Sequence, residues 1–479
     1  MEYTLESLRE HEMFRWFIEI SSVPRGSGNT KAISELTADF ASVRGLQYER
    51  DALGNVVITK PASPRKENCE PIMLQAHLDM VCAAQSGKNI DMSVTPPQLV
   101  IDGDWLRADG TTLGADNGIG VAMMFALLDN TDTVHPPLVC VFTVDEETGM
   151  EGAYGLDKSR LGSRRMLNLD AEREGEFFAG CAGGNKAVVR IPVTSLEQDG
   201  DSWRIELDGL AGGHSGVDID RGRAAAPVLM GRVLMELRCS AEMRCARLEC
   251  GQADNAIADH ATADVVCAAG FDLPGTLASL ESTFHSEYGI TDPGLHLRAE
   301  RIDLPKETLD DAGTDKLICL LLNVPQGVIE RSSHIAGMPQ TSSNLGVVRV
   351  GPDGIYAEAC IRSAVATQQD WINLRFASLV KSLGGTVERC RGAGAWEFVP
   401  GSPLRAECIM AWKELFGVEP AVRISHAGAE CGIFVAEMPG LDCVSLGPTI
   451  ENVHTPNERL NIESSIRVYN YLKYVIARL

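Results

Sequence analysis

The sequence lacks the features that would direct it to a membrane, to an extracellular compartment or to nucleic acid. No apolar run approaches the 18 residues of a membrane-spanning helix. Residues 1–6 contain no basic segment and lead into no apolar one, so no secretory signal is expected. The formal net charge of −23 disfavours nucleic acids and anionic membranes as partners. We therefore expect a cytoplasmic protein that binds neither.

Paired cysteines are also missing. The 14 cysteines include no C-x-x-C pair, and the nearest group (Cys239, Cys245 and Cys250) does not have the spacing of a zinc site. Free thiols in a reducing compartment are therefore expected rather than disulfides. The chain has 479 residues, of which 44% are hydrophobic. This is more than a domain with a single hydrophobic core usually contains, so two domains are expected.

Short apolar runs that end on polar residues characterise the chain before residue 186 and after residue 391. Such near-continuous apolar runs are typical of strands buried on both faces, and segments of helical periodicity lie between them. The expected strands are 56–59, 71–80, 138–144, 166–169 and 441–446. The expected helices are 4–20, 30–43, 121–128, 404–416 and a C-terminal helix capped by Ser464.

The middle of the chain has a different pattern. Apolar and charged residues alternate there, and Gly351-Pro352-Asp353-Gly354 predicts the turn of a hairpin. We predict an α/β fold: one domain, residues 1–185 and 392–479, with a mixed, largely parallel sheet flanked by helices, and an α+β domain, residues 186–391, inserted into it. Residues 286–316 have too weak a periodicity to be assigned.

Several of the expected strands run into residues that can bind metal. His77 and Asp79 follow the first long apolar run, and a carboxylate that receives the imidazole N–H would fix the tautomer of a metal-bound His. Asp116 lies in the glycine-rich segment 110–120, although an Asp before a helix can also be a simple cap.

The acidic residues of the next strands complete the candidate set. The triple Asp145-Glu146-Glu147 follows one strand and Asp170 follows another, although an acidic triple is also typical of a solvated loop. Because sites in open α/β sheets lie at the carboxyl ends of the strands, these side chains are expected to converge.

Together with His454, these residues predict a two-metal site with five ligands: His77, Asp116, Glu147, Asp170 and His454. If Asp116 bridges, each ion has one His, one further carboxylate and the shared Asp. Nitrogen and oxygen ligands suit zinc, cobalt or manganese. Two such ions can hold a hydroxide between them, and Glu146 is placed to act as general base. This combination predicts amide hydrolysis.

Nine motifs resemble those of the aminoacyl-histidine dipeptidases (peptidase D), a branch of the dinuclear-zinc metallopeptidases. They occur in the family's order and span nearly the whole chain: AHLDM (76–80), GTTLGADNGIG (110–120), DEETGMEGAYGL (145–156), NLDAEREGE (168–176), GCAGG (180–184), GGHSG (212–216), DNAI (254–257), SHAGAECGIF (425–434) and GPTIENVHTP (447–456).

The resemblance implies the same ligand roles: His77 and Asp170 on one ion, Glu147 and His454 on the other, and Asp116 on both. It also implies that Asp79 orients His77, that Glu146 is the base, and that the Asp116–Asn117 peptide bond is cis. The metal would be two zinc ions per protomer, with cobalt or manganese as alternatives.

For the inserted domain, the resemblance implies a lid that also forms a homodimer. His214 would polarise the scissile carbonyl, at the active site of the partner protomer, and Asn255 and Arg362 would bind the substrate carboxylate and the transition state. Gly428 and Glu430 would belong to a substrate-binding loop. From the residues alone, an ordinary loop His at 214, a turn former at Asn255 and a surface ion-pair partner at Arg362 are the alternatives.

The expected function is metal-dependent hydrolysis of dipeptides, with Xaa-His as the preferred substrate. Two alternatives lie within the same group of enzymes, an aminotripeptidase and an N-acyl amino acid deacylase. A third is a non-catalytic relative that binds metal or peptide, although that would fit a broken ligand set better than this complete one.

Overall fold

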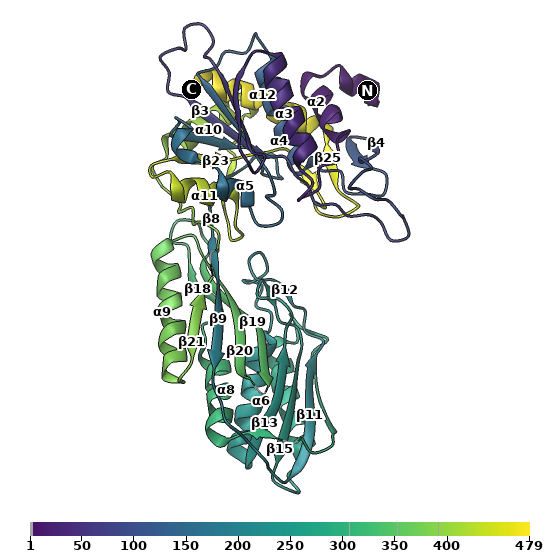
Figure 1. Ribbon diagram of the computed structural model, residues 1–479, viewed down its shortest axis with the longest axis vertical. Helices are drawn as coiled ribbons and strands as arrows, with labels where there is room; N and C mark the ends of the chain where they lie inside the picture. The colour runs from purple at the N-terminus through teal and green to yellow at the C-terminus, as the bar shows by residue number, and fades with distance from the viewer. Residues whose placement is uncertain (1–2, 306, 352, 391) are drawn as a thin grey trace. The chain divides into compact units, whose positions relative to one another are not determined.

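The computed structural model describes residues 3–305, 307–351, 353–390 and 392–479. The chain forms two compact units. One consists of Met1–Gly180, Phe398–Ile424 and Ala429–Leu479, and the other of Cys181–Glu397 and Ser425–Gly428. The ribbon in Figure 1 shows the elements of each. Two predicted positions, Pro352 in the hairpin turn and Arg391 at the end of the inserted domain, lie outside the described residues.

The first unit is built on a mixed sheet. Its strand order is β1 (Gln47–Arg50), β2 (Val56–Lys60), β6 (Leu138–Thr143), β3 (Ile72–His77), β7 (Arg165–Asn168), β23 (Asp442–Ser445), β8 (Glu176–Cys181) and β22 (Ala421–Ser425). The central strands β6, β3, β7 and β23 run parallel. The pairs β1–β2, β2–β6 and β23–β8 are antiparallel. The predicted fold class, a largely parallel sheet flanked by helices, is confirmed.

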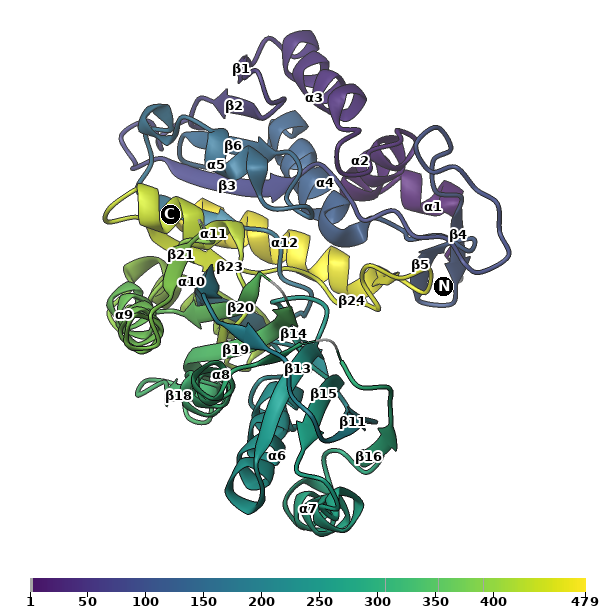
Figure 2. The same ribbon diagram turned by 60° about the horizontal axis from the view of Figure 1, so that its bottom comes forward.

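The helices of the first unit pack on this sheet through apolar and aromatic side chains. They are α1 (Leu5–Arg9), α2 (Glu12–Ser21), α3 (Lys31–Val43), α4 (Ala115–Asp129), α5 (Glu151–Gly155), α10 (Pro403–Phe416), α11 (Glu430–Glu437) and α12 (Ile462–Arg478). Phe40 of α3 stacks on Phe125 of α4 at 4.2 Å between ring centroids, and Phe125 meets Phe142 of β6 edge-on. Figure 2 shows α12 beside α4. No helix within the described residues has the length and apolar character needed to cross a membrane.

A small antiparallel sheet fixes the chain on either side of His454. Its order is β24 (Ile450–Glu451), β25 (Arg459–Asn461), β5 (Trp105–Ala108) and β4 (Leu99–Asp102). Residues 452–458 are therefore a loop held at both ends by strand pairing. The same sheet connects that loop to the segment that leads into α4.

The second unit is an antiparallel sheet with helices packed on it. The strand order is β16 (His296–Arg301), β11 (Asp201–Asp208), β15 (Ala261–Cys267), β13 (Met243–Cys250), β19 (Pro339–Gly351), β20 (Gly354–Ser363), β9 (Gly183–Ile191) and β21 (Thr386–Arg389), with β18 (Gly327–Arg331) on β19. Two short pairs are β10 (Ser195–Leu196) with β17 (Thr308–Leu309), and β12 (Gly213–His214) with β14 (Ala256–Ile257). The helices are α6 (Ala226–Ser240), α7 (Leu273–Tyr288), α8 (Asp311–Asn323) and α9 (Ala366–Ser382). Its buried apolar side chains form a core of their own.

Three local predictions need correction. The single helix expected over residues 4–20 is two helices, α1 and α2, separated at residues 10 and 11. The strand expected over residues 71–80 ends at His77, so Asp79 lies in the loop beyond it. Ser464 does not cap α12: the cap is Asn461, whose side chain accepts a hydrogen bond from the backbone of Ser464. The Ser464 hydroxyl instead accepts a hydrogen bond from the N–H of Thr449, at 2.8 Å. A short polar residue near a helix start has two possible partners, and its sequence position alone does not choose between them.

Candidate active site

The predicted site residues of the first unit meet at one edge of its sheet. His77 is the last residue of β3, Asp145–Glu147 begin two residues after β6 ends, and Asp170 lies two residues beyond β7. Because these strands are parallel neighbours, their carboxyl ends share an edge. These apolar runs in the sequence, each with a His or carboxylate at its end, were sufficient to predict that these residues converge.

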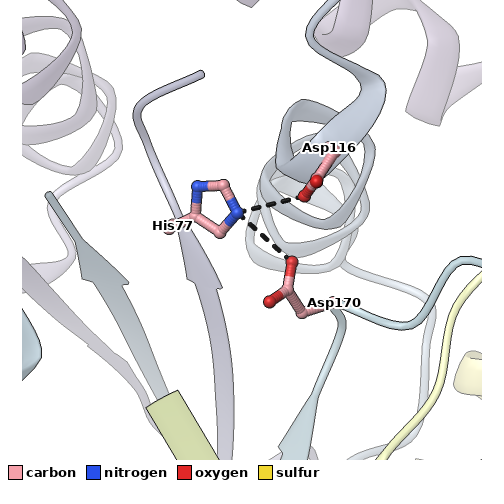
Figure 3. Close-up of side chains that lie close together, drawn as sticks. All are labelled: His77, Asp116 and Asp170. Atoms are coloured by element: carbon pink, nitrogen blue, oxygen red, sulfur yellow. Dashed lines mark hydrogen bonds and ion pairs between the residues drawn. The ribbon is translucent and has the colours of Figure 1, made fainter. Parts of the chain in front are cut away.

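His77 faces two carboxylates with one ring nitrogen. Its Nε2 lies 3.1 Å from Oδ1 of Asp116 and 3.3 Å from Oδ1 of Asp170. Figure 3 shows the imidazole at the end of its strand, with Asp116 coming from the start of a helix and Asp170 from a loop. The three residues are far apart in sequence, and the sheet and helix α4 bring them together.

His454 makes the matching arrangement on the other side of Asp116. Its Nε2 lies 3.2 Å from Oδ2 of Asp116 and 3.0 Å from Oε2 of Glu147. The two carboxylate oxygens of Asp116 therefore point to two different histidines. His77 is 1% exposed and the side chain of His454 is 48% exposed, so one half of the site is interior and the other open.

Asp116 lies in the first turn of α4 and does not cap this helix. The residue at the cap position of α4 is Gly114, with no capping side chain, and Asp116 and Asn117 have non-helical backbone angles. The peptide bond between Asp116 and Asn117 is cis. The capping alternative is therefore wrong, because both oxygens of Asp116 are directed at imidazole nitrogens.

Asp79 links His77 to the acidic segment. Its Oδ1 lies 3.4 Å from Nδ1 of His77. Its two oxygens also accept the backbone N–H groups of Glu146 at 3.0 Å and Glu147 at 3.2 Å. Burial opposes ionisation of Asp79, but the hydrogen bond and the charge of His77 prevail and lower its pKa to about 2. The acidic triple is thus held by the fold rather than solvated.

The charges at this edge are unbalanced. Burial raises the pKa of Glu146 well above its ordinary value and that of Asp170 to about 7. Hydrogen bonds that His454 donates to Asp116 and Glu147 raise its pKa to about 10. Carboxylates outnumber cationic groups here, and the buried ones resist ionisation unless positive charge is brought to them.

The donor set fits metal ions. A neutral imidazole nitrogen that faces two carboxylate oxygens can donate at most one hydrogen bond, and the buried Oδ1 of Asp170 receives none of normal geometry. Ligand atoms around a tetrahedral ion with bonds of about 2.0 Å stand about 3.3 Å apart, close to the separations seen here. His77, Asp116 and Asp170 form one possible ligand group, and Asp116, Glu147 and His454 another.

Three further predicted residues lie close together in the second unit. His214 is in β12, and its Nδ1 accepts the N–H of Gly216 at 3.2 Å. The next residue, Ser215, donates its N–H to the carbonyl of Asn255 at 2.8 Å and accepts a hydrogen bond from Nε of Arg362 at 3.4 Å. Burial and the charge of Arg362 lower the pKa of His214, which favours its neutral form.

The last two predicted residues fall in different units. Gly428 belongs to the short segment Ser425–Gly428 that is part of the second unit. Glu430 opens α11 in the first unit and is 0% exposed. Its Oε2 accepts hydrogen bonds from Nε2 of Gln75 at 2.5 Å and from the hydroxyl of Thr143 at 2.8 Å, and burial raises its pKa to about 7. A contact between Glu430 and substrate stays a prediction.

Two buried charged residues that we did not predict contact the same loops. Arg25 is 1% exposed and Glu458 is 2% exposed. Glu458 is four residues from His454, a spacing that could have drawn attention to it, whereas Arg25 follows a Val-Pro pair with no distinguishing pattern. Both act mainly on backbone groups, which side-chain motifs do not reveal.

Comparison with known proteins places this geometry in a family. The model of peptidase family M20/M25/M40 matches residues 73–478. Cytosol non-specific dipeptidase of Escherichia coli (strain K12) is 35% identical over 466 residues, which cover 96% of each chain. The crystal structure of aminoacylhistidine dipeptidase from Vibrio alginolyticus has a TM-score of 0.91 and 31% identity, and the match covers 100% of this chain and 98% of that one.

A more distant structure shares the fold alone. Aminopeptidase PepT from Bacillus cereus ATCC 10987 has a TM-score of 0.56 at 16% identity, with 98% of each chain covered. The family match spans most of this chain, and the Escherichia coli relative is similar over nearly its whole length. The chain therefore belongs to peptidase family M20/M25/M40, and it is a hydrolase of peptide bonds.

Proposed function

We propose that this protein is a metal-dependent dipeptidase that prefers Xaa-His substrates. The observation that carries the proposal is the double role of Asp116, whose two oxygens lie 3.1 and 3.2 Å from the imidazoles of His77 and His454. The names of the similar proteins, a non-specific dipeptidase and an aminoacylhistidine dipeptidase, support the substrate class.

The metal would be two zinc ions per protomer, with cobalt or manganese as alternatives. In this proposal His77 and Asp170 hold one ion, Glu147 and His454 the other, and Asp116 both. Ions bound there would polarise the scissile carbonyl and bring the pKa of water towards neutrality. Nitrogen and oxygen ligands without thiolate are compatible with each of the three metals.

Glu146 is the proposed general base. The N–H of Glu146 is tied to Asp79, so the backbone that carries the Glu146 side chain is fixed beside His77. Burial raises its pKa, which brings the group closer to the pH at which a carboxylate exchanges protons efficiently. Glu146 would accept a proton from water and pass it to the leaving amine, while Asp79 holds His77 in one tautomer.

We also propose substrate roles for the cluster in the second unit. His214, in its neutral form, would donate a hydrogen bond to the carbonyl oxygen that becomes negative during attack. Asn255 and Arg362 would bind the substrate carboxylate, for which the planar guanidinium is suited. Gly428 would contribute backbone contacts to the same substrate group, and Glu430 a further contact.

A substitution at Arg362 separates this carboxylate role from a structural one. Arg362→Ala should lower kcat/KM for a dipeptide by about 10–100-fold, since a charge-assisted hydrogen bond contributes roughly 1.5–3 kcal/mol. The same variant should hardly change kcat/KM for the corresponding dipeptide amide, which has no terminal carboxylate. Arg247→Ala, at an exposed position of β13, is the control. Equal losses on both substrates would contradict the carboxylate role.

A substrate panel with metal exchange tests the proposal as a whole. The purified protein should cleave Xaa-His dipeptides faster than other dipeptides, and should leave tripeptides and N-acyl amino acids nearly untouched. A chelator should abolish hydrolysis, and zinc, cobalt or manganese should restore it. Preference for a tripeptide or an N-acyl amino acid would favour an aminotripeptidase or a deacylase of the same family. Metal uptake without hydrolysis of any of these would indicate a non-catalytic relative.

Two further properties belong to the proposal. We place the protein in the cytoplasm, supported by the name of the Escherichia coli relative. We also propose a homodimer formed through the second unit, which would act as a lid. Exposed apolar side chains on α9, Trp371 at 43% and Leu374 at 67%, are compatible with such a contact.

A further inference from the structure

The loop that contains Asp116 is held by one buried carboxylate. Oε2 of Glu458 accepts the N–H groups of Leu113 at 2.8 Å and Gly114 at 2.9 Å. Oε1 accepts those of Ala115 at 2.7 Å and Asp116 at 3.3 Å. Consecutive N–H groups directed at one carboxylate form a concave anion site made of backbone, here filled by a side chain of the same chain. Burial raises the pKa of Glu458, while the backbone N–H groups oppose that rise.

The same loop is held from its other side by Arg25. Nη1 of Arg25 donates to the carbonyls of Leu78 at 2.9 Å and Asp79 at 3.0 Å. Its Nη2 donates to the carbonyl of Gly114. One guanidinium therefore joins the residues just beyond β3, which follow His77, to the residues just before Asp116.

The peptide of Gly114 is where the two residues meet. Its N–H is bound by Glu458 and its carbonyl by Arg25. Gly114 has φ of +71°, and a Cβ there would come within 2.6 Å of Nη2 of Arg25. A Cβ on Gly118 would approach the same nitrogen to 2.4 Å. Gly114 and Gly118 thus make room for the guanidinium, which accounts for part of the glycine-rich pattern of segment 110–120.

We propose that Arg25 and Glu458 are positioning residues that fix Asp116 and His77 for metal binding. Glu458 is also four residues from His454, in the loop held by β24 and β25. A single short segment therefore supplies one ligand and anchors the backbone of the shared one. The inference rests on the proposed function, because it assigns to these residues the task of setting the separation between ligands of the two ions.

The expected consequence is a loss of metal affinity rather than a loss of folding alone. Partners of ligand residues contribute typically 10–100-fold to metal affinity. Glu458→Gln keeps the shape but turns an NH₂ group towards two of the four backbone donors. It should raise the Kd for Zn²⁺ or Co²⁺ alone by about 10–100-fold. Arg25→Lys keeps the charge but cannot span three carbonyls as the guanidinium does, so about a 10-fold rise is expected.

The measurements are titration of the metal-free protein with Zn²⁺ and the visible absorption spectrum of the Co²⁺ form. Both variants should change the Co²⁺ spectrum, which reports ligand geometry, and lower kcat more than they raise KM. The double variant should be affected less than the product of the single effects, because both residues act through the Gly114 peptide.

Asp442→Asn is the matched control. Asp442 accepts the N–H of Leu404 at 2.9 Å and the hydroxyl of Ser402 at 2.6 Å, at the start of β23 and so at the strand end away from the site. Its metal affinity and spectrum should match the wild type even if its Tm falls.

Two results would overturn parts of this picture in distinguishable ways. If wild-type protein binds Zn²⁺ and Co²⁺ but Glu458→Gln binds them with Kd within about twofold and an unchanged spectrum, the positioning role is wrong. If Glu458→Gln does not fold, Arg25→Lys decides by the same criterion. If the wild type itself takes up neither ion, the proposed function fails instead.

Discussion

Glu146→Gln should lower kcat for dipeptide hydrolysis by about 10²–10⁴-fold and leave the metal content unchanged, because general acid–base catalysis contributes an effect of that size. The amide has nearly the shape of the carboxylate but cannot accept a proton from water. The N–H of Glu146 is bound to Asp79, so the backbone at this position keeps its place in the variant.

The variant also tests how the acidic triple divides its tasks. Glu147 lies 3.0 Å from His454 and belongs to a possible ligand group with it and Asp116, whereas Glu146 shares a group with His77 and Glu147 and is in none with His454. Metal analysis, Zn²⁺ titration and steady-state kinetics on the same preparation give the answer. Glu151→Gln, an exposed acid in the first turn of α5, should behave like the wild type. Turnover that survives in Glu146→Gln would show that another group is the base.

The sequence was informative about the site because the positions of its His and acidic residues match the strand ends of the sheet. Three of the buried apolar runs end at or just before His77, Glu147 and Asp170, and in a parallel sheet neighbouring strand ends share one edge. Side-chain type and position at a strand end were therefore enough to predict that these three residues meet. The bounds of the strands were predicted less well. Strand β3 ends at His77, and Asp79 lies beyond it, where its carboxylate accepts the backbone N–H groups of Glu146 and Glu147.

What could not be predicted depends on contacts between backbone and side chain. Glu458 binds four consecutive N–H groups of a loop more than 340 positions away, and no periodicity records that. Glu430 was expected in a substrate-binding loop on the strength of a motif, yet its carboxylate accepts hydrogen bonds from Gln75 and Thr143 within the first unit. Ser464 and Asn461 illustrate the same limit at a helix start, where two polar residues compete for one role.

Asp116→Asn should have the other large effect, a loss of both metal ions. An amide has a single oxygen, so Asn could bind the ion beside His77 or the ion beside His454 but not both. Its NH₂ group would face the other ion and repel it. We expect occupancy of both positions to fall and kcat/KM to drop by at least roughly 10³-fold, or about 4 kcal/mol.

Asp170→Asn is the comparison that gives this result its meaning. Asp170 lies 3.3 Å from His77 and is in no ligand group with His454. Its loss should weaken one position and leave the position of Glu147 and His454 largely filled. Metal analysis after dialysis, together with stepwise Co²⁺ titration, should therefore give near-zero occupancy for Asp116→Asn and about one ion for Asp170→Asn. An equal number of bound ions in the two variants would mean that Asp116 does not join two ions. The assignment of the other four ligands to two ions depends on this shared role and would then be wrong.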